Sequence, residues 1–213
     1  MWIDTHCHLN AGEFDADLAA VASDARRSGV DRIVIPGVER ANFATVRTLA
    51  HRTHRGRRVR ARHPSALHAA RDRRRSARAA RRDEESLDDP RFVGIGEIGL
   101  DYFVPTLDDA RQQFFYNEQL KLARTFGLLV ICHVRKSQDK MLKGLRVHDI
   151  HCGIAHAFNG SFQQAEAFQG MWLGFSGNLT FERARQIRRL AAGLPLEAIV
   201  LQTDAPDIVP SWR

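Results

Sequence analysis

The sequence has few of the features that mark secreted or membrane proteins. No apolar run approaches the roughly 20 residues that a bilayer-spanning helix needs, and the N-terminus has no basic region followed by an apolar stretch. The 213 residues include three cysteines, an odd number at scattered positions, which argues against a disulfide framework. We therefore expect a cytoplasmic protein with reduced thiols, no association with a membrane and no obligate protein partner.

Acidic residues are almost absent from one segment, and positive charge is concentrated there. Residues 52–82 contain 13 arginines and a single acid, Asp72, so the rest of the chain has a net charge of −5 although the whole carries +7. The basicity is therefore local and gives no reason to expect a fold that binds nucleic acid over its whole surface. With 44% hydrophobic residues, we expect residues 1–213 to form a single globular domain in which 52–90 is an atypical segment.

Outside that segment, the apolar pattern predicts strands that alternate with helices. The predicted strands are residues 2–8, 32–37, 92–97, 128–134, 153–158, 171–175 and 198–204. The predicted helices are residues 13–28, 40–51, 108–126 and 181–192, with further helical stretches before the strands at 153 and 171 and a Gly-Leu-Asp turn after residue 97. Seven strands, with a slot for an eighth in 52–90, indicate a parallel (β/α)8 barrel. The alternative is an open doubly wound sheet, which is weakened because no Gly-rich dinucleotide fingerprint follows the first strand.

Residues that bind metals recur near the ends of the predicted strands. His6 and His8 are two residues apart, so on a strand they project from the same face, beside Asp4. Four later strands end in Glu97, His133, His156 and Asp204. In a parallel barrel these ends converge on one face, and four histidines with two carboxylates suffice for two divalent ions about 3.5–4 Å apart. Each residue alone has an ordinary structural explanation, whereas their joint placement favours a metal site.

Five motifs, in this order along the chain, resemble the signatures of the TatD family of metal-dependent hydrolases and deoxyribonucleases. They are residues 4–8 (DTHCH), 96–101 (GEIGLD), 133–135 (HVR), 156–161 (HAFNGS) and 203–206 (TDAP). The resemblance covers most of residues 1–50 and 90–213. It implies an amidohydrolase-like barrel that cleaves phosphodiester bonds with metal-activated water.

The resemblance also assigns roles to individual residues. His6 and His8 would hold one metal, Glu97 would bridge two, and His133 and His156 would hold the second. Asp204 would bind the first metal and position or deprotonate the attacking water, so that Glu97 and Asp204 are the expected catalytic residues. The expected cofactors are two divalent ions (Mg²⁺, Mn²⁺ or Zn²⁺), and the expected substrate is DNA, with single-stranded ends plausible.

Two further residues are candidates for substrate binding. Arg135 has the planar fork that suits phosphate oxygens, although the same residue would serve equally well as an ordinary surface cation. His63, followed by Pro64, matches a His-Pro element that follows the third strand in the family.

The chain departs from the family pattern in three places. Residues 52–90 replace a strand and an amphipathic helix; a shifted reading frame and an arginine-rich nucleic-acid arm are the two explanations. Gln202 stands where the family usually has Glu. The chain also stops at Arg213, where the family continues into a closing helix. We therefore expect a barrel with a degenerate third βα unit and a missing C-terminal helix.

Two other functions are compatible with the sequence. One is an amidohydrolase that acts on a cyclic amide or ester, although a bridging Glu97 argues against the version that uses a carboxylated lysine. The other is a degenerate, inactive family member that keeps the ligands but folds poorly.

Overall fold

The structure is a computed structural model, and it describes residues 1–53 and 88–212 as an α/β fold with parallel strands. Its seven described strands are β1 (Trp2–Asp4), β2 (Val30–Ile33), β3 (Ile95–Asp101), β4 (Val130–Arg135), β5 (Gly153–His156), β6 (Met171–Phe175) and β7 (Ile199–Leu201). They form a two-stranded sheet, β1-β2, and a five-stranded sheet in the order β3-β4-β5-β6-β7. Strand order follows chain order, as expected when each strand is succeeded by a helical crossover.

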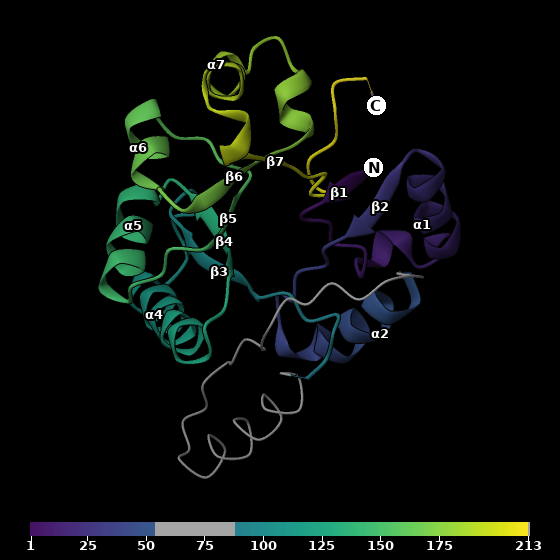
Figure 1. Cartoon of the computed structure of the whole chain (residues 1–213), viewed down its shortest axis with the longest axis horizontal. Coiled ribbons are helices and arrows are strands. Elements are labelled where there is room, and N and C mark those ends of the chain that lie inside the picture. Colours follow the sequence, from purple (N-terminus) through teal and green to yellow (C-terminus); the bar gives the residue numbers. More distant parts are fainter. Residues whose placement is uncertain (54–87, 213) are drawn as a thin grey trace.

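Helices connect the strands and lie outside them (Figure 1). The described α-helices are α1 (Leu18–Arg27), α2 (Phe43–Thr53), α4 (Asp109–Phe126), α5 (Gln138–Val147), α6 (Phe162–Ala167) and α7 (Arg185–Gly193). Short 3₁₀ turns occupy Gly12–Phe14, Arg40–Asn42, Gly177–Thr180 and Leu196–Ala198. The ends of α4 follow from its sequence: the Asp108 side chain caps the N-terminus, and Gly127 takes the left-handed conformation that ends the helix.

Backbone hydrogen bonds join the two sheets on both sides. The Thr5 amide donates to the Leu201 carbonyl over 3.0 Å, which places β1 beside β7. On the other side, the Gly37 amide donates to the Gly96 carbonyl over 3.0 Å and the Glu97 amide donates to Gly37 over 3.2 Å. The described strands therefore follow one another around a ring, with their carboxyl ends at the same end of it. The slot for an eighth strand is predicted in residues 52–90, of which residues 54–87 lie outside the described part of the chain.

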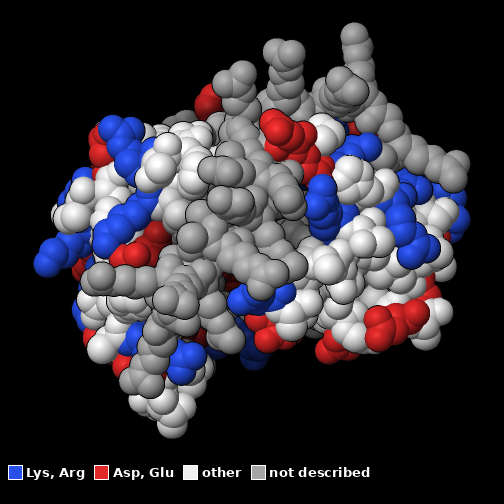
Figure 2. All heavy atoms as spheres, turned by 90° about the horizontal axis from the view of Figure 1, so that it is seen from below, with Lys and Arg blue, Asp and Glu red and all other residues white. Residues whose placement is uncertain are grey.

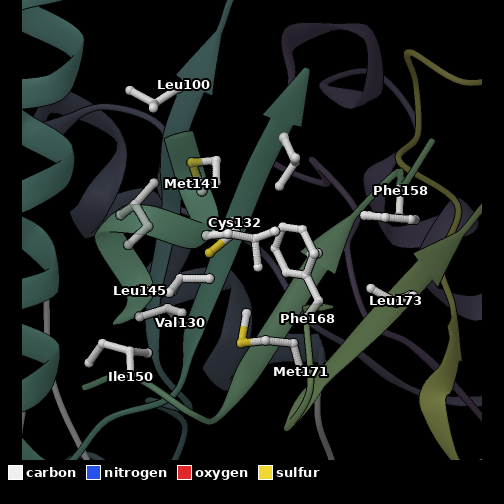
Figure 3. Packing of buried hydrophobic residues seen from close by; sticks show 14 of the residues in the cluster. Leu100, Val130, Cys132, Met141, Leu145, Ile150, Phe158, Phe168, Met171 and Leu173 are labelled. Atoms are coloured by element: carbon white, nitrogen blue, oxygen red, sulfur yellow. The ribbon is translucent and has the colours of Figure 1, made fainter. Parts of the chain in front are cut away.

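The main apolar core lies between the five-stranded sheet and the helices that cover it (Figure 3). Cys132 of β4 and Phe158 after β5 are fully buried, and Phe168 stacks edge-on against Phe158 with ring centroids 5.4 Å apart. The Tyr116 hydroxyl donates to the Met141 carbonyl over 2.8 Å and so links α4 to α5. This packing fixes the carboxyl ends of β3, β4 and β5 relative to one another.

The described surface mixes charges of both signs. On the face shown in Figure 2, Lys and Arg side chains are interspersed with Asp and Glu. Among the helices of the described ranges, none is both long and apolar enough to cross a bilayer.

Several predicted boundaries were wrong. The strand predicted to end at residue 97 continues to Asp101, and the predicted Gly-Leu-Asp turn is part of β3. Apolar side chains at Ile98 and Leu100 pack into the core at 2% and 1% exposure, so the alternation of a strand continues past Glu97. The helix predicted from residue 13 begins at Leu18, since a 3₁₀ turn over Gly12–Phe14 and a further turn over residues 15–17 precede it.

The first and last strands are shorter than predicted. β1 ends at Asp4, and the next residues bond alternately to both sides: Thr5 to Leu201, Cys7 to Val34 and His8 to Ala205. These hydrogen bonds keep the chain extended, but they do not form a regular ladder with a single neighbouring strand. β7 likewise ends at Leu201, so His6, His8 and Asp204 lie on the segments just past strands rather than on them.

Candidate metal centre

Four side chains, from β3 and from the segments that follow β1 and β7, point their donor atoms at one another. His6 Nε2 lies 3.3 Å from His8 Nε2, 3.4 Å from Glu97 Oε2 and 3.5 Å from Asp204 Oδ1. His8 Nε2 lies 3.7 Å from Glu97 Oε2 and 3.3 Å from Asp204 Oδ1. The histidines predicted to share a face therefore do converge, although the segment that carries them is not regular strand.

A second set of donors meets the other oxygen of Glu97. His133 Nδ1 and His156 Nε2 each lie 2.7 Å from Glu97 Oε1, and these two nitrogens are 3.1 Å apart. Glu97 thus turns one carboxylate oxygen toward each set. This is the arrangement in which a carboxylate can bridge two ions.

The spacing of the donor atoms fits divalent ions. A tetrahedron of ligands about 2.1 Å from its centre, the usual distance of nitrogen and oxygen from Zn²⁺, has edges of about 3.4 Å. Five of the six separations among the four donors of the first set span 3.3–3.7 Å. In the second set they are 2.7–3.1 Å, near the edge of about 3.0 Å of an octahedron with ligands about 2.1 Å away. The donor types, imidazole and carboxylate, accept several metals.

Asp4 anchors the segment that carries His6 and His8. Its carboxylate accepts hydrogen bonds from the His6 amide at 3.2 Å, from the Thr203 amide at 2.9 Å and from the Thr203 hydroxyl at 2.6 Å. Burial is the largest influence on Asp4 and raises its pKa. This carboxylate joins the segment after β1 to the segment that carries Asp204.

Asp204 occupies an unusual backbone conformation. Its φ is 55°, a left-handed value that asparagine and aspartate tolerate better than most residues. The Asp204 amide donates to the His6 carbonyl over 2.8 Å, and its own carbonyl accepts from the amides of Asp207 and Ile208. These bonds turn the chain sharply after β7 and direct the Asp204 carboxylate toward the histidines.

Glu97 lies inside β3 rather than at its end, which corrects the predicted position. The β3–β4 register pairs Gly96 with Ile131 and Ile98 with Cys132, so Glu97 is an extra residue in a bulge. A bulge re-aims one side chain while the flanking residues keep their faces. It directs Glu97 into the site and keeps Ile98 in the core.

The two carboxylates of the site are held in their charged form. Burial tends to raise the pKa of Glu97, but hydrogen bonds with three site histidines hold this pKa well below its usual value. Burial also tends to raise the pKa of Asp204, but the hydrogen bond with His8 and the proximity of His156 and His6 together outweigh burial and lower this pKa. Both groups are therefore anionic at neutral pH and suited to cations.

The histidines respond to their surroundings in different ways. Burial lowers the pKa of His6, which favours the neutral imidazole that metals need. The hydrogen bond with Asp204 raises the pKa of His8. Burial tends to lower the pKa of His133, but its contact with Glu97 raises it overall.

Asp101 is a site residue that the sequence analysis missed. Its Oδ2 lies 3.4 Å from His133 Nε2, so it can orient the ring whose Nδ1 faces Glu97. The signal was present in the sequence. Ile98 and Leu100 alternate with Glu97 and Asp101, so a continuing strand would have placed both acids on the face opposite the core.

Gln202 is buried behind the site, and only part of its amide is satisfied. Its Oε1 accepts from the Ala157 amide over 3.3 Å, while Nε2 has no hydrogen-bond partner among the described residues. A side chain at Gly174 would place its Cβ 1.9 Å from Gln202 Oε1, so glycine there leaves room for the Gln202 amide. His6 Nδ1 and His156 Nδ1 are also buried without a partner in the described part of the chain.

The two donor sets open onto a cavity of about 730 Å³, large enough for a small ligand or the end of a polymer. No lysine or arginine lines it within the described ranges, and its wall is rich in acids: Glu13, Glu97, Asp101, Asp204 and Asp207. The cavity is therefore suited to cations, whose charge would offset its repulsion of an anionic substrate.

Of the two predicted substrate-binding residues, one lies near the centre and one falls outside the described chain. Arg135, half-exposed at the end of β4, has its Nη1 3.5 Å from Asp101 Oδ2. His63 lies outside the described residues.

Comparison with known proteins gives a consistent result across family, sequence and structure. The model of the family described as TatD related DNase matches residues 3–213. The chain is 38% identical over 212 residues to YjjV of Escherichia coli, described as an uncharacterized metal-dependent hydrolase, covering 97% of this chain and 80% of YjjV. It is 29% identical over 221 residues to the 3'-5' ssDNA/RNA exonuclease TatD of Erwinia tasmaniensis, covering 97% and 80%.

Solved structures agree with these matches. The crystal structure of the Escherichia coli YjjV protein superposes with a TM-score of 0.81 at 36% identity, over 97% of this chain and 80% of that one. A TatD-family hydrolase from Entamoeba histolytica gives a TM-score of 0.80 at 20% identity, over 98% and 75% of the two chains. The second likeness supports the fold alone.

Proposed function

Because the chain belongs to the TatD family of metal-dependent hydrolases, we propose that it is a two-metal phosphodiesterase that removes nucleotides from the ends of single-stranded DNA. The observation that carries this proposal is Glu97, whose two oxygens each face a separate set of donors. Relatives named 3'-5' ssDNA/RNA exonucleases support the substrate class and favour digestion from the 3' end.

The ligand assignment follows the two donor sets. His6, His8 and Asp204 would hold one ion, His133 and His156 the other, with Glu97 between them. When bound, such ions supply Lewis acidity toward phosphoryl oxygens and lower the pKa of water. Their charge would also offset the acids of the cavity wall.

Asp204 is the residue we propose as proton acceptor. Its Oδ1 faces His8 Nε2 at 3.3 Å, whereas its Oδ2 lies 3.7 Å from His156 Nδ1, beyond hydrogen-bond distance. A lowered pKa keeps the carboxylate charged, so Oδ2 can accept a proton from an attacking water molecule while Oδ1 serves as ligand. Asp101 would hold His133 in orientation.

An end-labelled assay tests this function. The protein is stripped with EDTA, reloaded with Mg²⁺, Mn²⁺ or Zn²⁺, and incubated with a single-stranded oligonucleotide labelled at its 5' end. We expect a ladder of shortened products that depends on metal, and Asp204→Asn should slow it by about 10²–10⁴-fold, the range for loss of a general base. Asp149→Asn is the matched control, since Asp149 is exposed and pairs with Arg124 away from the cavity.

A parallel assay on a cyclic amide such as dihydrouracil addresses the amidohydrolase alternative. Hydrolysis of the amide that disappears in Asp204→Asn, with no DNA cleavage at any metal, would overturn the proposal. Among the residues lining the cavity in the described ranges there is no lysine, so the carboxylated-lysine version of such a site has no support here.

A further inference from the structure

A half-exposed aromatic ring lies beside the metal centre, flanked by two cations. Phe103 follows β3 and is 51% exposed. The guanidinium carbon of Arg135 lies 4.0 Å from the centre of its ring, and Lys136 Nζ lies 4.8 Å from the same centre. We refer to Phe103, Arg135 and Lys136 as the Phe103 platform. An exposed aromatic side chain contacted by two cations differs from the ordinary scattered surface hydrophobe.

Asp101 connects this platform rigidly to the site. One carboxylate oxygen accepts from the Phe103 amide over 2.8 Å and the Val104 amide over 3.3 Å. The other lies 3.5 Å from Arg135 Nη1 and 3.4 Å from His133 Nε2. A single carboxylate therefore positions the platform and a proposed metal ligand together.

The backbone under the platform is fixed from a second side. The Gln112 side chain of α4 accepts from the Asp101 amide at 2.7 Å and donates to its carbonyl at 3.2 Å. Asp101 and Gln112 both line the cavity. The platform is thus joined to two residues of the cavity wall by a preorganised support, which reduces the entropy lost when a ligand is bound.

The charges of the platform complement those of the cavity. The described cavity wall carries acids and no lysine or arginine, so it offers nothing of its own to hold a phosphate. Arg135 has five N–H donors, and its guanidinium donates to Asp101 at the long distance of 3.5 Å. Arg135 and Lys136 therefore supply positive charge where a polyanion would enter.

We infer that the Phe103 platform binds an unpaired nucleobase of single-stranded nucleic acid, stacked with the Phe103 ring and the Arg135 guanidinium, with the adjacent phosphate held by Arg135 and Lys136. This inference rests on the proposed function and names the subsite next to its metals. Base–aromatic stacking tolerates any sequence because every base has a π-face, and stacking with arginine planes is equally general. A base pair would keep its faces within the helix, so the platform selects single strands.

Binding of fluorescein-labelled oligonucleotides to the EDTA-treated full chain tests the inference without cleavage. Phe103→Ala should raise the Kd for a thymidine dodecamer about 10- to 100-fold, and Phe103→Trp should restore it. An abasic dodecamer, which has phosphates and no bases, should bind Phe103→Ala and wild type alike. Arg135→Ala should weaken the binding of both oligomers, because both carry phosphates.

Phe114→Ala is the matched control, because Phe114 is 52% exposed on α4. Circular dichroism melting establishes that each variant is folded. Equal Kd values for Phe103→Ala and Phe114→Ala, or an equal loss of abasic binding in Phe103→Ala, would refute the stacking subsite. Displacement of the thymidine oligomer by polyglutamate at equal charge concentration would refute it too, in favour of an acidic protein partner.

Hydrolysis of a small diester tests the proposed function without involving the Phe103 platform. Phe103→Ala should hydrolyse methyl p-nitrophenyl phosphate at the wild-type rate while its KM for oligonucleotides rises. Wild-type cleavage of both substrates with an unchanged oligonucleotide KM in Phe103→Ala would overturn the platform alone. No cleavage of either substrate by wild type would overturn the proposed function, and the binding experiment would still decide the platform.

Discussion

Glu97 is the residue on which the two halves of the candidate centre depend. It contacts His133 and His156 through one oxygen at 2.7 Å each, and it faces His6 and His8 through the other at 3.4 and 3.7 Å. Asp204 also reaches the second set, but its Oδ2 lies 3.7 Å from His156 Nδ1, farther than Glu97 does. The consequences of changing Glu97 should therefore appear on both sides.

We expect Glu97→Gln to lose at least one bound metal. The glutamine amide keeps the size of the side chain, but its NH₂ group cannot ligate a metal. The substitution also removes the negative charge that offsets two cations. Metal content by inductively coupled plasma mass spectrometry, after equilibration with Mn²⁺ or Zn²⁺, should fall from two ions per chain to one or fewer. The Asp149→Asn control should retain the wild-type content. A full complement in Glu97→Gln would contradict the bridging role.

At Gln202, the informative substitution adds a negative charge instead of removing one. Replacement by Glu keeps the acceptor for the Ala157 amide and removes the unpaired Nε2 donor, but adds a buried charge next to the segment of Asp204. Uncompensated buried charge is unfavourable, and bound cations relieve it. We therefore expect Gln202→Glu to lower the melting temperature of the metal-free protein and to tighten metal binding, measured by calorimetric titration. A metal-free variant as stable as wild type, with unchanged affinity, would contradict this.

Most of the candidate ligands could be found from the sequence, whereas their supports could not. His6, His8, His133 and Asp204 stood out because polar residues end apolar strands. The roles of Asp4 and Asp101 depend on contacts across the fold, with Thr203 in one case and with His133 in the other. Such long-range hydrogen bonds leave no local pattern in the chain.

At the scale of elements, boundaries were predicted well where a local signal decides them. The helix α4 was placed within one residue because Asp108 caps its start and Gly127 ends it. The ends of β1 and β7 were missed because their neighbours decide them: the chain after Asp4 bonds to Leu201 on one side and Val34 on the other. Which strand borders which is a tertiary property that periodicity does not encode.

Asp89 ties α2 to the segment that leads into β3. Its side chain, 5% exposed, accepts from Arg47 Nε at 2.8 Å, and it lies 2.9 Å from His51 Nε2. We expect Asp89→Asn to reduce the free energy of unfolding at pH 7 by about 1–3 kcal/mol, the usual range when a buried hydrogen-bonded charge loses its partners. Urea denaturation measures it, and Asp31→Asn is the control because Asp31 is half-exposed at 50%.

The pH dependence of that effect has a definite sign. Burial tends to raise the pKa of Asp89, but its contacts with His51, the Arg91 amide and Arg47 together outweigh burial and lower this pKa below 3.8. A lowered pKa in the folded state means that the stabilisation is present above the unfolded value and is lost as pH falls through the folded one. The difference between wild type and Asp89→Asn should persist from pH 7 to 5 and shrink below about pH 4. A difference that grows in acid would contradict the role of Asp89.

At the scale of the whole molecule, the candidate centre joins parts of the chain that are far apart in sequence. Its donors follow β1 and β7 and belong to β3, β4 and β5. Ile3 and Leu201, on the adjacent β1 and β7, are 42% and 47% exposed, so this junction gains little from apolar burial. Hydrogen bonds of Asp4 and Thr203 hold it, and a bound cation would add to them.

We therefore expect divalent metal to stabilise the whole fold. A ligand that binds only the folded state adds about 2.7 kcal/mol at 100 times its Kd, which for a chain of this size corresponds to about 5–11 °C in melting temperature. Melting followed by circular dichroism, with EDTA and then with Mn²⁺, Mg²⁺ or Zn²⁺, should show this rise. The double variant His6→Ala/His8→Ala should lose most of it, because the first donor set is then reduced to two carboxylates. A wild-type chain without a cooperative transition under any of these conditions would instead favour the inactive, poorly folded alternative.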